Sequence, residues 1–181
     1  MILKQGWGFS KNKGWVFGYK LHLSCSTDKL IVLLSVNFST ANISDNQLYY
    51  NLIESLPNET QYVVSDLGYN DHKLCDYSKN RCITLVCPIS KYKHAKGKRL
   101  KQIQFYKSDS GLQIYQNRSI SVEPLFWCIK DTFGISVMPV YGFANTRSYV
   151  MLCILVYQLA VYYNCITGMN NPRCIKRMLG N

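Results

Sequence analysis

Two acidic side chains stand where this sequence could do chemistry, and the first is Asp66. Residues 62–64 (Tyr-Val-Val) have high strand propensity, and Pro57 upstream and Gly68 downstream bound them as a short buried strand. A carboxylate at the carboxyl end of a central strand points into the crevice where open α/β sheets bind ligands. Asp66 is therefore a candidate ligand or catalytic acid. The competing interpretation is that it only caps a turn.

The second acid, Glu123, lies in a predicted helix over residues 119–133, in which Pro124 is tolerated because it falls in the first turn. Glu123 and Lys130 are seven residues apart, so at about 100° per residue they share one face of the helix. The apolar stripe falls on another face, which lets Glu123 reach a crevice while the helix packs. That stripe consists of Leu125, Phe126, Ile129 and Phe133.

Carboxylates of this kind suit divalent metal. Mg²⁺ prefers carboxylate oxygens from few side chains, with water completing its shell. Two such ions about 4 Å apart can activate an attacking oxygen and stabilise a leaving one in phosphoryl transfer. Asp66 and Glu123 alone are a weak signal for such a site.

The sequence predicts that the elements which position these acids form an α/β layered domain, in the order β-β-α-β-α-β. Residues 1–14 are expected to be irregular. The next strand alternates, with Trp15, Phe17, Tyr19, Leu21 and Leu23 on its buried face. The helix at 44–56 opens with a capping box of Ser44 and Gln47. The expected elements are strands at 15–23, 30–36, 62–65 and 84–88 and helices at 44–56, 71–79 and 119–133.

The net charge of +11 favours a polyanionic partner, either nucleic acid or an anionic membrane surface. The basic residues crowd residues 90–110, where aromatic rings interleave with them. That mixture suits a nucleic-acid backbone, while a solvated charged loop is the plainer interpretation. The candidate phosphate contacts are Lys96, Lys98 and Arg99, among the cations Lys91, Lys93, Lys101 and Lys107.

Residues 149–163 are the most apolar stretch of the chain. They are shorter than the roughly 20 residues that a membrane span needs, and Gln158 counts against one, so a buried helix with Leu155 in the core is favoured. The eight cysteines form no zinc-binding spacing and are expected to be reduced core thiols of a cytoplasmic protein.

The sequence resembles bacterial insertion-sequence DDE transposases over nearly its whole length. Residues 66–69 (Asp-Leu-Gly-Tyr) and 118–130, from Arg118 through Glu123 to Lys130, are similar to their catalytic motifs. Residues 18–22 (Gly-Tyr-Lys-Leu-His) resemble their second strand, and residues 40–45 (Thr-Ala-Asn-Ile-Ser-Asp) the start of their first helix. In many members the arginine lies four residues before the glutamate, whereas here it lies five before, a mild departure.

The resemblance implies an RNase H-like fold, a layered mixed sheet flanked by helices, with a basic insert at about 90–117. It also implies metal-dependent DNA strand cleavage and transfer with Mg²⁺ or Mn²⁺ as cofactor. Asp66 and Glu123 would be the second and third catalytic, metal-binding carboxylates. Arg118 and Lys130 would contact DNA phosphates, and Tyr115 and Tyr69 would help to position the DNA.

The resemblance fails at the front, where the family has an Asp on a strand before residues 18–22. The early acids here are Asp28, in a predicted turn, and Asp45, at a helix start. The fold is therefore expected to be incomplete at its first strand, and the chain to be a truncated, inactive fragment.

Two alternatives stay open: a non-catalytic DNA-binding or inhibitory transposase remnant, and a membrane-associated basic protein. The expected partners are DNA, as transposon ends and target, and a second copy or a full-length transposase; no membrane is expected.

Overall fold

The computed structural model describes residues 5–10, 14–27, 31–89 and 95–176. The chain divides into two compact units: unit 1 comprises residues 1–43 and 121–181, and unit 2 comprises residues 44–120. The described residues form both strands and helices, with three strands first, a mixed middle part and four consecutive helices last, so the mixed α/β class predicted from the sequence is confirmed.

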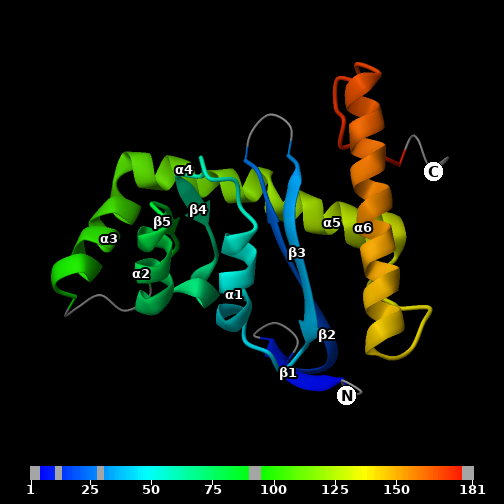
Figure 1. Cartoon of the computed structure of the whole chain (residues 1–181), viewed down its shortest axis with the longest axis horizontal. Helices are drawn as coiled ribbons and strands as arrows, with labels where there is room; N and C mark the ends of the chain where they lie inside the picture. Colours follow the sequence, from blue (N-terminus) through cyan, green and yellow to red (C-terminus); the bar gives the residue numbers. More distant parts are fainter. Residues whose placement is uncertain (1–4, 11–13, 28–30, 90–94, 177–181) are drawn as a thin grey trace. The chain divides into compact units, whose positions relative to one another are not determined.

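Unit 1 contains an antiparallel three-stranded sheet in the order β1-β2-β3 (Figure 1). Its strands are β1 (Gly6–Ser10), β2 (Gly14–Cys25) and β3 (Leu33–Thr40). The first half of β2 pairs with β1, and the second half, from Tyr19 on, pairs with β3. The strands expected at residues 15–23 and 30–36 correspond to β2 and β3, which pair antiparallel. The expectation that residues 1–14 are irregular is wrong for residues 6–10, which form β1 and pair with β2; residues 1–4 and 11–13 lie outside the described residues.

The predicted buried face of β2 is only half right. Leu21 and Leu23 pack against the core of unit 1, but Trp15 and Phe17 are exposed. Because the first half of β2 pairs with β1 and not with β3, its side chains lie outside the core cluster. On the other face of β2, His22 is buried and its Nε2 lies 3.2 Å from Ser39 Oγ.

In the part of unit 1 that the structure describes, two helices accompany the sheet: α5 (Val122–Phe133) and α6 (Phe143–Ile166). Their inner faces and β3 form the core, to which Ile175 from the chain's end is added. Gln158, the polar residue within α6, donates from Nε2 to Leu33 O at 3.2 Å, which satisfies its amide next to the core. The fully buried cluster consists of Leu33, Leu125, Ile129, Val150, Ile154, Tyr157, Ala160, Val161 and Ile175.

The helix expected at residues 149–163 is confirmed within α6, but only one of its faces is buried. Leu155 is 51% exposed and Ile154 is 3% exposed, so the prediction that Leu155 is core is wrong. A helix that packs against one core buries one stripe of its side chains and leaves the opposite stripe exposed. By length and composition α6 could also cross a membrane, which is weak evidence because the core helix of a soluble protein passes the same test.

Unit 2 packs four helices around a parallel pair of strands, β4 (Tyr62–Val64) and β5 (Thr84–Val86) (Figure 1). The predicted capping box of the first helix is present, since Gln47 Oε1 accepts from Ser44 N–H at 3.2 Å. Tyr49 and Ser78, whose hydroxyl oxygens are 2.7 Å apart, join the first two helices in the core. The helices are α1 (Asp45–Glu54), α2 (His72–Asn80), α3 (Gly97–Lys107) and α4 (Asp109–Ile120).

The basic segment is not a charged loop where the structure describes it. Residues 90–94, including Lys91 and Lys93, lie outside the described residues. From Gly97 on, two consecutive helices form, α3 and α4. They approach so closely that a Cβ at Gly111 would lie 1.9 Å from Phe105 O, so only glycine fits there.

The helix predicted over residues 119–133 is interrupted at Ser121. There α4 ends at Ile120, and α5 begins at Val122, with Pro124 in its first turn as predicted. The interruption coincides with the division between the units, so Arg118 belongs to unit 2 and Glu123 to unit 1.

The prediction that the cysteines lie in the core is only partly right. All eight are free thiols, but Cys82, Cys165 and Cys174 are exposed.

Candidate DNA-processing site

Asp66 lies two residues beyond the end of β4, as the sequence predicts. It caps the 3₁₀ turn Leu67–Tyr69, where its Oδ1 accepts from Gly68 N–H at 2.9 Å. Its other oxygen, Oδ2, lies 4.0 Å from Arg118 Nη2, and its side chain is about half exposed. Asp66 therefore does cap a turn, yet it keeps a solvent-accessible oxygen beside a cation.

Tyr69 lies among the same charges. Burial raises the pKa of the Tyr69 hydroxyl, the Asp45 and Asp66 carboxylates raise it further, and the Arg118 guanidinium lowers it. The phenol is therefore protonated at neutral pH, a donor among carboxylates. Its ring lies 5.7 Å from that of Tyr49, which ties the turn to α1.

Asp45 is the residue that sequence reasoning set aside. It occupies the first turn of α1 and reaches the turn after β4: a Cβ built at Gly68 would lie 3.1 Å from Asp66 Oδ1 and 3.6 Å from Asp45 Oδ2. The two carboxylates thus border the same glycine. The available signal is the Ser-Asp start of the helix, although an acid in the first turn also suits the helix dipole.

Tyr115 and Arg118, one turn apart on α4, complete this group (Asp66, Tyr69, Tyr115 and Arg118) within unit 2. Burial raises the pKa of the Tyr115 hydroxyl, and Arg118 lowers it. The Tyr115 ring meets that of Tyr106 edge to face at 5.4 Å. The structure therefore brings together four of the residues predicted for the site, namely Asp66, Tyr69, Tyr115 and Arg118.

The other two predicted residues of the motif lie on α5, in unit 1. Glu123 is exposed in the first turn, and Lys130 is exposed in the last turn, its Nζ 5.6 Å from the centre of the Phe126 ring. Leu125 and Ile129, between them in sequence, are fully buried. The helix therefore packs by its apolar stripe and leaves the acid and the lysine accessible, as predicted.

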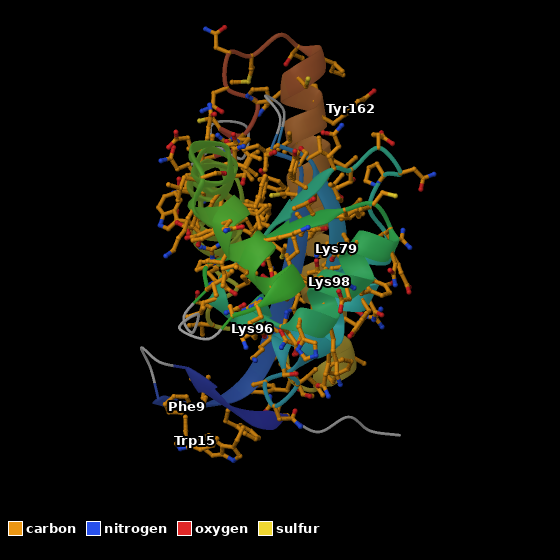
Figure 2. All side chains as sticks on the ribbon, turned by 90° about the vertical axis from the view of Figure 1, so that its left-hand side faces the viewer. Phe9, Trp15, Lys79, Lys96, Lys98 and Tyr162 are labelled. Carbon is orange, nitrogen blue, oxygen red and sulfur yellow. The ribbon has the colours of Figure 1, made fainter. Side chains whose placement is uncertain are left out.

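The predicted phosphate contacts lie at the start of α3. Lys96 is exposed, and the exposed Lys98 Nζ lies 3.8 Å from Asp76 Oδ1. Figure 2 shows Lys79, Lys96 and Lys98 on one side of unit 2. Arg99 differs, because its guanidinium donates to Gln102 Oε1 at 2.8 Å and to Asn70 Oδ1. It ties α3 to the loop that follows the 3₁₀ turn.

The donor chemistry of this site suits a hard divalent cation, because Asp45 and Asp66 offer carboxylate oxygens next to a glycine. Among the residues that the structure describes, however, no group of three or more Asp, Glu, His or Cys side chains could hold a metal ion. The ligand atoms of Asp45 and Asp66 are therefore of the type that a divalent metal prefers, but the described residues do not supply a full set of ligands.

An α/β chain with a carboxylate at a strand end, a neighbouring arginine and a basic side is the kind of protein that acts on nucleic acid. Comparison with protein families gives the class directly: residues 3–159 match the family described as "Transposase DDE domain". The chain belongs to this DDE transposase family, as the motifs predict, and membership implies DNA as its partner and divalent metal in the family's chemistry. No curated protein and no solved structure matched the chain.

Proposed function

We propose that this chain is the catalytic part of a DDE-type DNA transposase in which Asp66 and Glu123 are the second and third metal-binding carboxylates. The observation that carries the proposal is the position of Asp66 after β4, with one oxygen fixed by Gly68 N–H and the other 4.0 Å from the Arg118 guanidinium. The family match over residues 3–159 supports it.

In the proposed reaction, water attacks a phosphodiester and the bond to the 3′-oxygen breaks, which leaves a 3′-hydroxyl and a 5′-phosphate. That 3′-hydroxyl then attacks a phosphodiester of the target DNA and displaces the target's own 3′-oxygen, which leaves as a hydroxyl. Bound Mg²⁺ or Mn²⁺ would supply charge stabilisation at the phosphate. Arg118 and Lys130 bind phosphates near the scissile bond, and Tyr115 and Tyr69 position the strand. Lys96, Lys98 and Arg99 hold DNA further away, as part of the basic insert at about 90–117.

We further propose that the fold is RNase H-like but incomplete at its first strand, and that the strand with the first catalytic Asp is not among these 181 residues. The first 27 residues hold no Asp or Glu at all. The chain by itself is therefore expected to bind DNA in the cytoplasm without cleaving it. This absence also favours a second candidate, a non-catalytic remnant that pairs with a full-length transposase and inhibits it.

Strand cleavage and transfer with Mg²⁺ or Mn²⁺ test the proposal. The 181-residue chain should be inactive, and the chain extended by an upstream segment with an Asp-bearing strand should nick DNA in the presence of metal. In the extended protein, Asp66→Asn and Glu123→Gln should reduce nicking to background and leave DNA binding largely intact. Asp71→Asn is the matched control, because Asp71 caps α2 by accepting from Lys73 N–H and has no proposed role in cleavage.

Two results would contradict the proposal. Strand transfer by the 181 residues alone would mean that another acid, with Asp45 the first to test, completes the site. Full activity of the extended Asp66→Asn variant would remove Asp66 from it.

A further inference from the structure

The β1–β2 hairpin holds four aromatic side chains on one face, and all are at least half exposed. Trp7, Phe9, Trp15 and Phe17 are 60, 65, 69 and 50% exposed. Trp7 is directly opposite Phe17, and Phe9 is opposite Trp15. The ring centroids of these pairs are 5.2 and 5.6 Å apart, so the four rings lie as two contacting pairs on one face of the hairpin.

The opposite face of β1 fixes this orientation. Gly6 and Gly8 alternate with the aromatic residues and lie against the chain that follows β3. A Cβ at Gly8 would lie 2.3 Å from Ala41 O, and a Cβ at Gly6 would lie 2.4 Å from Asn42 Oδ1. At Gly8 the neighbouring atom belongs to the backbone, so only glycine allows this approach, and the aromatic face is the one turned away from the chain that follows β3. Figure 2 shows Phe9 and Trp15 side by side at the hairpin.

The charge of this part of the chain limits what can cover the face. The first 27 residues of the sequence hold four lysines and no acid, and the whole chain has a net charge of +11. A second copy of the chain would meet like charge. A ligand with flat apolar surfaces and negative charge would meet complementary charge, and DNA bases on their phosphate backbone are such a ligand.

We propose that the aromatic face of the β1–β2 hairpin binds unpaired DNA by stacking its bases on Trp7, Phe9, Trp15 and Phe17. In a duplex the base faces are stacked on one another, so only unpaired nucleotides offer them to a protein ring. The inference rests on the proposed function for its ligand, DNA, but it concerns a site without carboxylates and needs no metal.

Intrinsic fluorescence tests the site directly, because the sequence has three tryptophans and two are in the hairpin. In a Trp127→Phe background the emission reports only Trp7 and Trp15. Titration with a 16-nucleotide oligo(dT) in the presence of EDTA should quench it, and titration with a 16-base-pair duplex should not.

A set of variants then assigns the binding to the rings. In the otherwise unchanged chain, the double variant Trp7→Leu/Trp15→Leu, which keeps apolar bulk without an indole, should bind labelled oligo(dT) roughly tenfold or more weakly. Trp7→Phe/Trp15→Phe should stay within about threefold of the parent, because a phenyl ring still stacks. The matched control is Tyr162→Leu/Tyr163→Leu, two exposed rings on α6, which should leave oligo(dT) binding unchanged.

The outcomes are separable from those of the cleavage assay, since neither metal nor nicking is involved. Equal loss of oligo(dT) and duplex binding in the Leu double variant, or no loss of either, would overturn the proposal. Concentration-dependent self-association that the Leu double variant abolishes, without quenching by oligo(dT), would also overturn it and assign the face to a second copy of the chain.

Discussion

Arg118 Nη2 lies 4.0 Å from Asp66 Oδ2, so the last turn of α4 brings a guanidinium to the carboxylate that follows β4. The two side chains are 27 and 48% exposed. Such a solvent-accessible pair contributes little to folding, because water screens the attraction. The pair nevertheless sets a cation beside a candidate metal ligand, where the guanidinium can bind a DNA phosphate.

Replacing Arg118 should therefore weaken DNA binding more than it lowers the stability of the fold. We expect Arg118→Gln to lower the free energy of unfolding by no more than about 1 kcal/mol. The slope of log affinity against log salt should flatten by about one unit, as for the loss of one phosphate contact. Urea denaturation and salt titration of DNA binding measure the two effects, and Arg118→Lys should keep the slope. A loss of stability above about 3 kcal/mol would instead show a structural ion pair.

Lys96 and Lys98 should contribute to non-specific duplex binding. Their joint replacement by Gln is expected to flatten the salt slope by about two units, at roughly 0.9 per phosphate. Arg99 stays unchanged in this variant. Its replacement would also remove the hydrogen bonds to Asn70 and Gln102, so an effect on folding could not be separated from an effect on DNA binding. Lys176→Gln is the control, since Lys176 already pairs with Asp131. An unchanged slope in the double variant would exclude phosphate contact at the start of α3.

Neighbouring residues of α6 should respond in opposite ways to a buried charge. Ile154→Asp should unfold or aggregate the protein, because an unpaired charge in the core costs several kcal/mol. Leu155→Asp should stay folded, since that side chain is half exposed. Circular dichroism with urea denaturation compares the two. Unfolding by both variants would mean that both faces of α6 are covered.

The Cys87 thiol should make folding sensitive to alkali. Burial raises the pKa of this thiol from 9.0 to about 12, so the folded state favours the protonated form. Its contribution is complete below the unfolded pKa, near 9, and is lost as the pH rises toward 12. The difference in unfolding free energy between the parent and Cys87→Ala, measured from pH 8 to 11, should shrink with rising pH. A difference that stays constant would mean that Cys87 ionises as freely in the folded state as in the unfolded chain.

Local sequence predicted the elements whose signals are short-range. The capping pair of Ser44 and Gln47, the strand that ends before Asp66 and the tolerance of Pro124 in a first turn all depend on residues within a few positions of one another. These predictions are confirmed. The assignment of residues 66–69 and 118–130 to transposase motifs led to the family that the comparison shows.

Burial and proximity were decided only in three dimensions. Alternation predicts Trp15 on a buried face, but the first half of β2 pairs with β1, and Trp15 lies outside the core. Leu155 and Ile154 are both apolar, and only the packing of α6 shows that Ile154 is buried and Leu155 is half exposed. Asp45 and Asp66 are 21 positions apart in the sequence, yet they border the same glycine. Sequence patterns fix which residues can share a face, whereas the face that meets the core, and the distant side chains that it brings together, follow from packing of the whole chain.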